Sequence, residues 1–155
     1  MRKLHITGLM VLFSIGLSVG NLVAEEASVD PDSIYARLGG QAAIDAAVDI
    51  FYKKLLADDK VNFFFEDINM DAQIRKQKEF LGAAFGGPKP WKGKDMRKAH
   101  ENLDISDEDF AAVAGHLHST LKDLKVDEKL IGEIMALVGS TKADVTNQPA
   151  AKAKP

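Results

Sequence analysis

The sequence predicts an all-α domain. Apolar residues recur at intervals of three and four through most of residues 33–145, and neither strand-like alternation nor an internal repeat is present. Glycine pairs at 39–40 and 86–87 divide these periodic segments into separate helices. The net charge of −3 argues against nucleic-acid binding, which requires a basic surface. The sequence has no cysteine, which excludes disulfides, cysteine nucleophiles and zinc–thiolate sites.

Residues 1–24 have the pattern of a secretory signal peptide. Arg2 and Lys3 precede an apolar segment, and the small residue Ala24 marks a cleavage site. The apolar segment is short for a membrane span, so we expect export, to the periplasm in a Gram-negative bacterium, without stable membrane insertion after cleavage. An uncleaved membrane anchor is the alternative. Residues 25–32 are predicted to be an acidic linker, and residues 146–155 a disordered tail.

The helices of the domain can be placed from their start and stop signals. Ser33 is a cap for the first helix, and Ser106, with Asp109 three residues on, is a capping box for the fifth. An aromatic corner at 60–66 precedes the third helix, and a loop at 89–95 follows it. The predicted helices span residues 34–38, 41–57, 71–85 and 96–100, then run from 106 with an apolar stripe to Leu124, and from 127 to 144.

Three polar side chains stand among apolar residues. Gln73 and Gln77 are four residues apart and share one helix face. Tyr52 follows Phe51 on the preceding helix, and a buried tyrosine hydroxyl needs a hydrogen-bond partner. Burying such groups is costly without partners, and this pattern suits a ligand site. From spacing alone the plainer interpretation stays open: solvated glutamines and a tyrosine bonded to the backbone.

His100 is the candidate metal ligand. It has no second histidine at metal-ligand spacing, which makes a zinc site a poor fit. One histidine is the usual protein ligand on one face of haem iron, although a lone histidine is more often structural than a ligand. Lys76 lies between Arg75 and Gln77 and fits a solvated basic face. As a neutral amine it could also bind a metal.

The motifs taken in order resemble a known family. They are Ser33-Ile34-Tyr35-Ala36-Arg37-Leu38-Gly39-Gly40, Phe51-Tyr52, Leu56-Ala57-Asp58-Asp59, Phe64-Phe65, Gly86-Gly87-Pro88, Met96-Arg97-Lys98-Ala99-His100 and Val113-Ala114-Gly115-His116-Leu117. Together they resemble the truncated haemoglobins, most closely group I, over residues 33–146. The resemblance implies a two-over-two helical sandwich around haem b, and it assigns residues 33–145 to this globin domain.

The resemblance also assigns roles to residues. His100 is implied to be the proximal iron ligand, and Tyr52, Gln73 and Gln77 to form a distal hydrogen-bond cluster. Lys76 falls where some relatives place a distal iron ligand, which makes six-coordinate iron through Lys76 a hypothesis. A further set is implied to line the haem pocket: Phe51, Phe65, Phe80, Leu81 and Met96. The paired glycines free the loop that carries the proximal histidine. Some relatives attach haem covalently through a histidine of the last helix. Because this sequence has no histidine after His118, we expect non-covalent haem.

The function implied is reversible binding of O₂, and of NO and CO, at haem iron. Oxidation of NO to nitrate is a further activity that the resemblance allows, with an electron donor outside this chain. The alternative is a periplasmic electron-transfer or redox- or gas-sensing haem protein with six-coordinate iron. A third interpretation, of a different class, is a helical interaction module without a cofactor.

Overall fold

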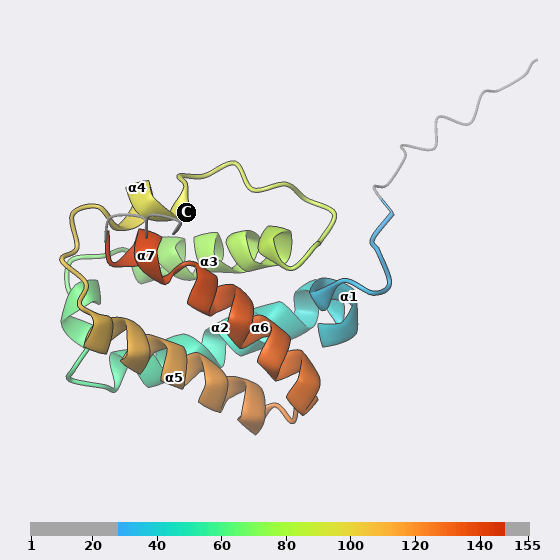
Figure 1. Cartoon of the computed structure of the whole chain (residues 1–155). Coiled ribbons are helices and arrows are strands. Elements are labelled where there is room, and N and C mark those ends of the chain that lie inside the picture. The colour runs from blue at the N-terminus through green and yellow to red at the C-terminus, as the bar shows by residue number, and fades with distance from the viewer. Residues whose placement is uncertain (1–27, 148–155) are drawn as a thin grey trace, which may run out of the picture.

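The computed structural model describes residues 28–147, and all regular structure in this range is helical (Figure 1). The helices are α1 (Ile34–Leu38), α2 (Gly40–Leu56), the 3₁₀ helix η1 (Asn62–Phe65), α3 (Met70–Ala84), α4 (Met96–His100), α5 (Asp107–Asp123), α6 (Glu128–Ser140) and α7 (Lys142–Val145). The predicted all-α fold is confirmed for this range. The predicted signal peptide, residues 25–27 of the linker and residues 148–155 of the tail lie outside the described residues.

Four long helices form two pairs. Helix α2 packs along α3, α5 packs along α6, and contacts between α2 and α5 join the pairs. Within each pair the helices run in opposite directions (Figure 1). The short α1 closes one end by packing on α2 and α6, and α4 packs against α7. The long segment between α3 and α4 passes over the outside of α3 (Figure 1). The arrangement is a two-over-two helical sandwich.

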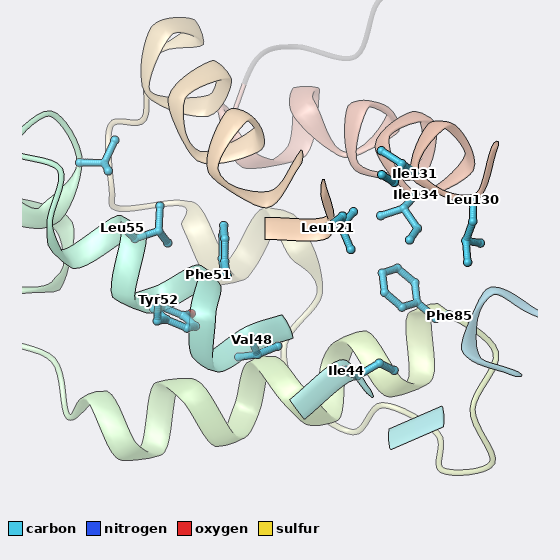
Figure 2. Close-up of a cluster of buried hydrophobic side chains, with 11 residues drawn as sticks. Ile44, Val48, Phe51, Tyr52, Leu55, Phe85, Leu121, Leu130, Ile131 and Ile134 are labelled. Carbon is cyan, nitrogen blue, oxygen red and sulfur yellow. The ribbon is translucent and has the colours of Figure 1, made fainter. Parts of the chain in front are cut away.

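Helix α2 contributes most to the apolar core. Its residues Ile44, Val48 and Leu55 are at most 2% exposed, and they recur at helical spacing on one face. Side chains from α5 and α6, including Leu121 and Ile134, complete the cluster shown in Figure 2. The cluster explains why helices of ordinary propensity are stable here, since packing of an apolar face provides most of the stability of a helix in a protein.

Two helix starts have the capping predicted from the sequence. The side chain of Ser33 accepts a hydrogen bond from the backbone of α1, as predicted, and Asp95, which was not predicted to be a cap, does the same for α4. Ser106 and Asp109 form the predicted capping box. Helix α3 was predicted to begin at Asp71, but it begins at Met70. The cap is Asn69, whose side chain accepts the N–H of Ala72.

The prediction of one helix over residues 127–144 is wrong, because the structure has two helices there. The segment is divided into α6 and α7, with Thr141 between them. The hydroxyls of Ser140 and Thr141 donate to the backbone carbonyls of Leu137 and Val138, at 2.6 and 2.7 Å. Side-chain bonds of this kind compete with the helical backbone pattern. They end α6 and allow α7 to take a different direction toward α4 (Figure 1).

The Gly86-Gly87 pair ends α3 in a Schellman motif. Gly86 has a left-handed φ of 90° and its N–H bonds to Ala83, while the N–H of Gly87 bonds to the carbonyl of Gly82 at 2.8 Å. A Cβ on Gly87 would lie 2.5 Å from that carbonyl oxygen and 2.8 Å from the ring of Tyr35. The glycines therefore permit a close approach of the chain to α1, rather than only freeing the loop that follows.

Candidate functional site

His100 is the last residue of α4, and its ring is held by its own helix. Nδ1 lies 2.7 Å from the backbone oxygen of Met96. Because a carbonyl oxygen only accepts hydrogen bonds, Nδ1 carries a proton, and in the neutral ring the lone pair is then on Nε2. A histidine whose second nitrogen is fixed in this way is the form that binds metals. Met96, predicted to line the haem pocket, is half-buried and holds the His100 ring through its backbone.

Tyr52 places a polar group in the core face of α2. The residue is 3% exposed, and its hydroxyl oxygen accepts a hydrogen bond from Nε2 of Gln73 at 3.1 Å. Burial raises the pKa of this hydroxyl, and the bond from Gln73 offsets the shift in part. Among residues 28–147 nothing accepts the proton of the hydroxyl itself. The structure thus brings Tyr52 and Gln73 together and leaves one O–H donor for a ligand.

Aromatic rings enclose the Tyr52 side chain. Phe51 and Phe65 both meet its ring edge to face, with centroids 5.5 and 5.7 Å away. Phe65 comes from η1, so the corner after α2 folds back onto the same tyrosine. These contacts limit the rotation of Tyr52 and orient its hydroxyl, and they place two of the predicted haem-pocket residues directly beside it.

The other predicted residues take different positions. Leu81 and Phe51 both line an apolar cavity between α1, α2, α3, α5 and α6. Phe80 is half-buried and packs edge to face on Trp91 of the following loop, with centroids 5.5 Å apart. Gln77 is half-buried one helical turn beyond Gln73, and within the described part of the chain its side chain has no hydrogen-bond partner. Its amide, like the Tyr52 hydroxyl, is available to a ligand.

Lys76 is exposed, and no ion pair or hydrogen bond engages it within residues 28–147. It flanks the face of α3 that carries Gln73 and Gln77. Its long side chain can turn toward solvent or toward the distal side, so its role as an iron ligand stays a prediction.

Two polar contacts at the site were not predicted. Nε2 of His116 on α5 lies 2.7 Å from Oδ2 of Asp58, just after α2, and this bond lowers the pKa of Asp58. Just beyond α7, Nδ2 of Asn147 donates to the backbone oxygen of His100 at 2.9 Å. The sequence carries no local signal for either contact, because the partners are separated by 58 and 47 residues.

The residues present fit a haem. They supply one histidine with a free Nε2 on one element, and on another a buried hydroxyl donor with an amide partner. The sequence has no cysteine to provide a thiolate ligand. A histidine nitrogen ligand together with a polar hydrogen-bond donor in the pocket is the set of groups used by haem proteins that bind small gases. Within the described range no helix is long and apolar enough to cross a membrane.

Comparison with known proteins agrees with this geometry. Residues 33–147 match the family of bacterial-like globins. The group 1 truncated haemoglobin LI410 of Chlamydomonas moewusii is 48% identical over 77% of this chain and 71% of its own length. The group 1 truncated haemoglobin GlbN of Synechocystis is 45% identical over 75% of this chain and 98% of its own length.

Solved structures give the same result. The truncated haemoglobin of Tetrahymena pyriformis in its Fe(III) form superimposes with a TM-score of 0.70 and 41% identity, covering 73% of this chain and 97% of that one. The 2/2 haemoglobin of Synechococcus, solved in the cyanomet state with covalently attached haem, gives 0.71 and 43%, covering 75% and 99%.

The fold and the site therefore define a haem-binding globin. More narrowly, the chain belongs to the group 1 truncated haemoglobins. Membership confirms the predicted two-over-two fold and the haem cofactor, and it contradicts the interpretation as a helical module without a cofactor.

The raised pKa of Tyr52 makes stability sensitive to alkaline pH. Below about pH 10 the hydroxyl is protonated in both the folded and the unfolded chain, and it adds no pH dependence. As the pH rises further, the unfolded chain ionises first, so stability falls by up to about 1.4 kcal/mol per pH unit until the folded pKa is passed. Urea titrations at increasing pH should show a larger loss in the unaltered protein and in Tyr35→Phe than in Tyr52→Phe. Equal alkaline losses in all three proteins would contradict the assignment.

Proposed function

We propose that this globin binds O₂ reversibly at ferrous haem b, with His100 as the proximal ligand and Tyr52 as the principal distal donor. Haem supplies the iron at which a diatomic gas binds. The observation that carries the proposal is the buried Tyr52 hydroxyl, which Gln73 orients while its own proton stays free. NO and CO are further ligands of the same class. The haem is held non-covalently, because the sequence has no histidine beyond His118.

The distal residues act by hydrogen bonding. An O₂ ligand accumulates partial negative charge, and a donor aimed at it in a water-poor pocket stabilises that charge. Gln73 orients the Tyr52 oxygen through a 3.1 Å bond, so that the tyrosine proton is directed away from Gln73. Gln77, half-buried on the same face of α3, provides a second donor. The expected result is slow release of O₂.

Oxidation of NO to nitrate is a further activity that we propose for the same site. It requires an electron donor to reduce the haem iron again after NO is oxidised, and we expect this donor to be a separate molecule. The alternative of a dedicated electron-transfer or sensing protein is not favoured, because the relatives that this chain matches are described as haemoglobins.

The role of Tyr52 is tested by its O₂ release rate. Replacing Tyr52 with Phe removes one hydrogen bond to a charged acceptor, and O₂ should dissociate about 10- to 100-fold faster. Stopped-flow mixing of the O₂-saturated protein with dithionite and CO measures this rate. Tyr35→Phe is the matched control, since Tyr35 packs with its ring on Gly40 and Gly87, away from Gln73. An unchanged rate in Tyr52→Phe would refute the proposed role.

Coordination of iron by Lys76 is a separate proposal, supported by its position beside the Gln73–Gln77 face. If Lys76 is the sixth ligand, Lys76→Ala should convert the absorption spectrum of the ligand-free protein from six- to five-coordinate. The control is Lys53→Ala, which removes an exposed lysine from α2 instead of α3 and should leave the spectrum unchanged. Identical spectra of Lys76→Ala and the unaltered protein, in both ferric and ferrous states, would rule the coordination out.

We also propose that the globin is exported, with its leader removed near Ala24. The support is the sequence of residues 1–24, with two basic residues, an apolar segment and a small residue before Glu25. In a Gram-negative host, intact-mass measurement of the protein from the periplasmic fraction should show a chain that begins close to residue 25. A full-length chain in the cytoplasmic fraction would contradict export, and a full-length chain in the membrane fraction would indicate an anchor.

A further inference from the structure

We propose that the end of the globin domain positions the iron ligand: Asp144 on α7 and Asn147 just beyond it hold α4 and thereby set the orientation of His100. We call these two residues and their contacts the proximal strap. The inference rests on the proposed role of His100 and assigns positioning residues on an element that the sequence predicted to be an ordinary helix end followed by a tail.

Helix α4 needs an external support. It has five residues, far fewer than the length at which an isolated helix is stable in water. Loops flank it on both sides, and its main helical neighbour is α7 (Figure 1). The local contacts of α4 are short-range: the side chain of Asp95 accepts the N–H of Lys98 at 2.8 Å, and the N–H of Leu103 donates to the backbone oxygen of His100 at 3.1 Å. The contacts with α7 therefore largely set the direction of α4.

The first contact of the strap fixes the middle of α4. Arg97 donates from Nε and Nη2 to one carboxylate oxygen of Asp144, at 3.1 and 2.9 Å. The same Nη2 lies 3.3 Å from the backbone oxygen of Ala143, the second residue of α7. A planar guanidinium that contacts both a side chain and the backbone of one helix restricts rotation as well as distance.

The second contact acts on the ligand residue itself. Nδ2 of Asn147 donates to the backbone oxygen of His100 at 2.9 Å. Asn147 has a left-handed φ of 53°, a conformation that asparagine adopts more readily than most residues. The ring of His100 is bonded to Met96 and its backbone to Asn147, so both ends of the ligand residue are fixed.

The break in the last helix makes these contacts possible. Hydroxyl bonds at Ser140 and Thr141 end α6, and α7 then turns toward α4. A helix continuing straight from α6 would carry Asp144 and Asn147 away from Arg97 and His100. The interruption between α6 and α7 thus brings the end of the domain against α4 and His100.

Two variants remove the strap with little other change. Asp144→Asn keeps the shape of the side chain and removes the charge that pairs with Arg97. Asn147→Gly removes the amide that bonds to His100, and glycine retains the left-handed backbone without strain. The control is Asp107→Asn. This substitution breaks the 3.0 Å ion pair between Lys142 and Asp107, which connects α7 to α5. The side chains of Lys142 and Asp107 are 43% and 56% exposed, close to the 40% and 51% of Arg97 and Asp144.

The test reads the iron–histidine bond in the haem-loaded ferrous protein by resonance Raman spectroscopy. We expect the iron–histidine stretching band to shift and broaden in Asp144→Asn and Asn147→Gly, with roughly tenfold faster haem loss to an excess apoglobin in the double variant. Asp107→Asn should keep the band and the haem-loss rate of the unaltered protein.

Each outcome separates the strap from the role of His100. An unmoved band in both strap variants would overturn the positioning inference while leaving His100 as the ligand. Equal shifts in the control would overturn it as well, because general loosening of α7 would then be sufficient. A band that persists in His100→Gly would instead refute the proposed ligand, and with it the inference built on it.

Discussion

The buried hydroxyl of Tyr52 is the constraint on which much of the structure depends. Helix α2 has to bury this group beside Phe51 and Leu55, because the same face forms the core. A hydroxyl in such surroundings is costly unless it is hydrogen-bonded, and Gln73 provides that bond. Satisfying Tyr52 therefore dictates that α3 lies against α2 in a particular register, with Gln73 facing inward. The close packing of these two helices both buries apolar surface and completes the distal cluster.

The two sides of the candidate site are held by different physical means. On the distal side, Tyr52 lies among rings and aliphatic side chains, and its position follows from core packing. On the proximal side, His100 belongs to a short helix held by charged and polar contacts near the surface. Packing against a dense core is stiff, whereas partly exposed polar contacts are weaker and can be adjusted by single substitutions. The position of Tyr52 is thus fixed by core packing, whereas the position of His100 can be adjusted by substitutions near the surface.

Much of the fold could be predicted because its signals are local. Apolar spacing in α2, the cap at Ser33 and the capping box at Ser106 each act within a few residues, and the structure has them where the sequence places them. The break at Thr141 was missed because an apolar periodicity continues toward it. What ends the helix is a pair of hydroxyl-to-backbone bonds, which spacing does not reveal.

The candidate site was predictable to a smaller extent, for a related reason. Residue spacing placed Gln73 and Gln77 on one face but left solvated glutamines as the plainer interpretation, and the resemblance to a family was needed to assign Tyr52 and His100 their roles. The pairing of Tyr52 with Gln73 depends on how α2 and α3 pack, and that of Asn147 with His100 on where the last helix turns. Tertiary contacts between residues far apart in one sequence leave no local pattern to detect.

The hydrogen bond between Asp58 and His116 shows how the corner after α2 is joined to the second helix pair. Its two side chains are 24% and 25% exposed, more sheltered than those of Arg97 and Asp144, so solvent screens it less. Asp58 also accepts the N–H of Lys60, and its backbone oxygen accepts the N–H groups of Val61 and Asn62 that open η1. The corner that carries Phe65 onto Tyr52 is therefore bonded to α5 through one carboxylate. The contact between α2 and α5 thus does more than bury apolar surface, because it also fixes the turn that places Phe65 against Tyr52.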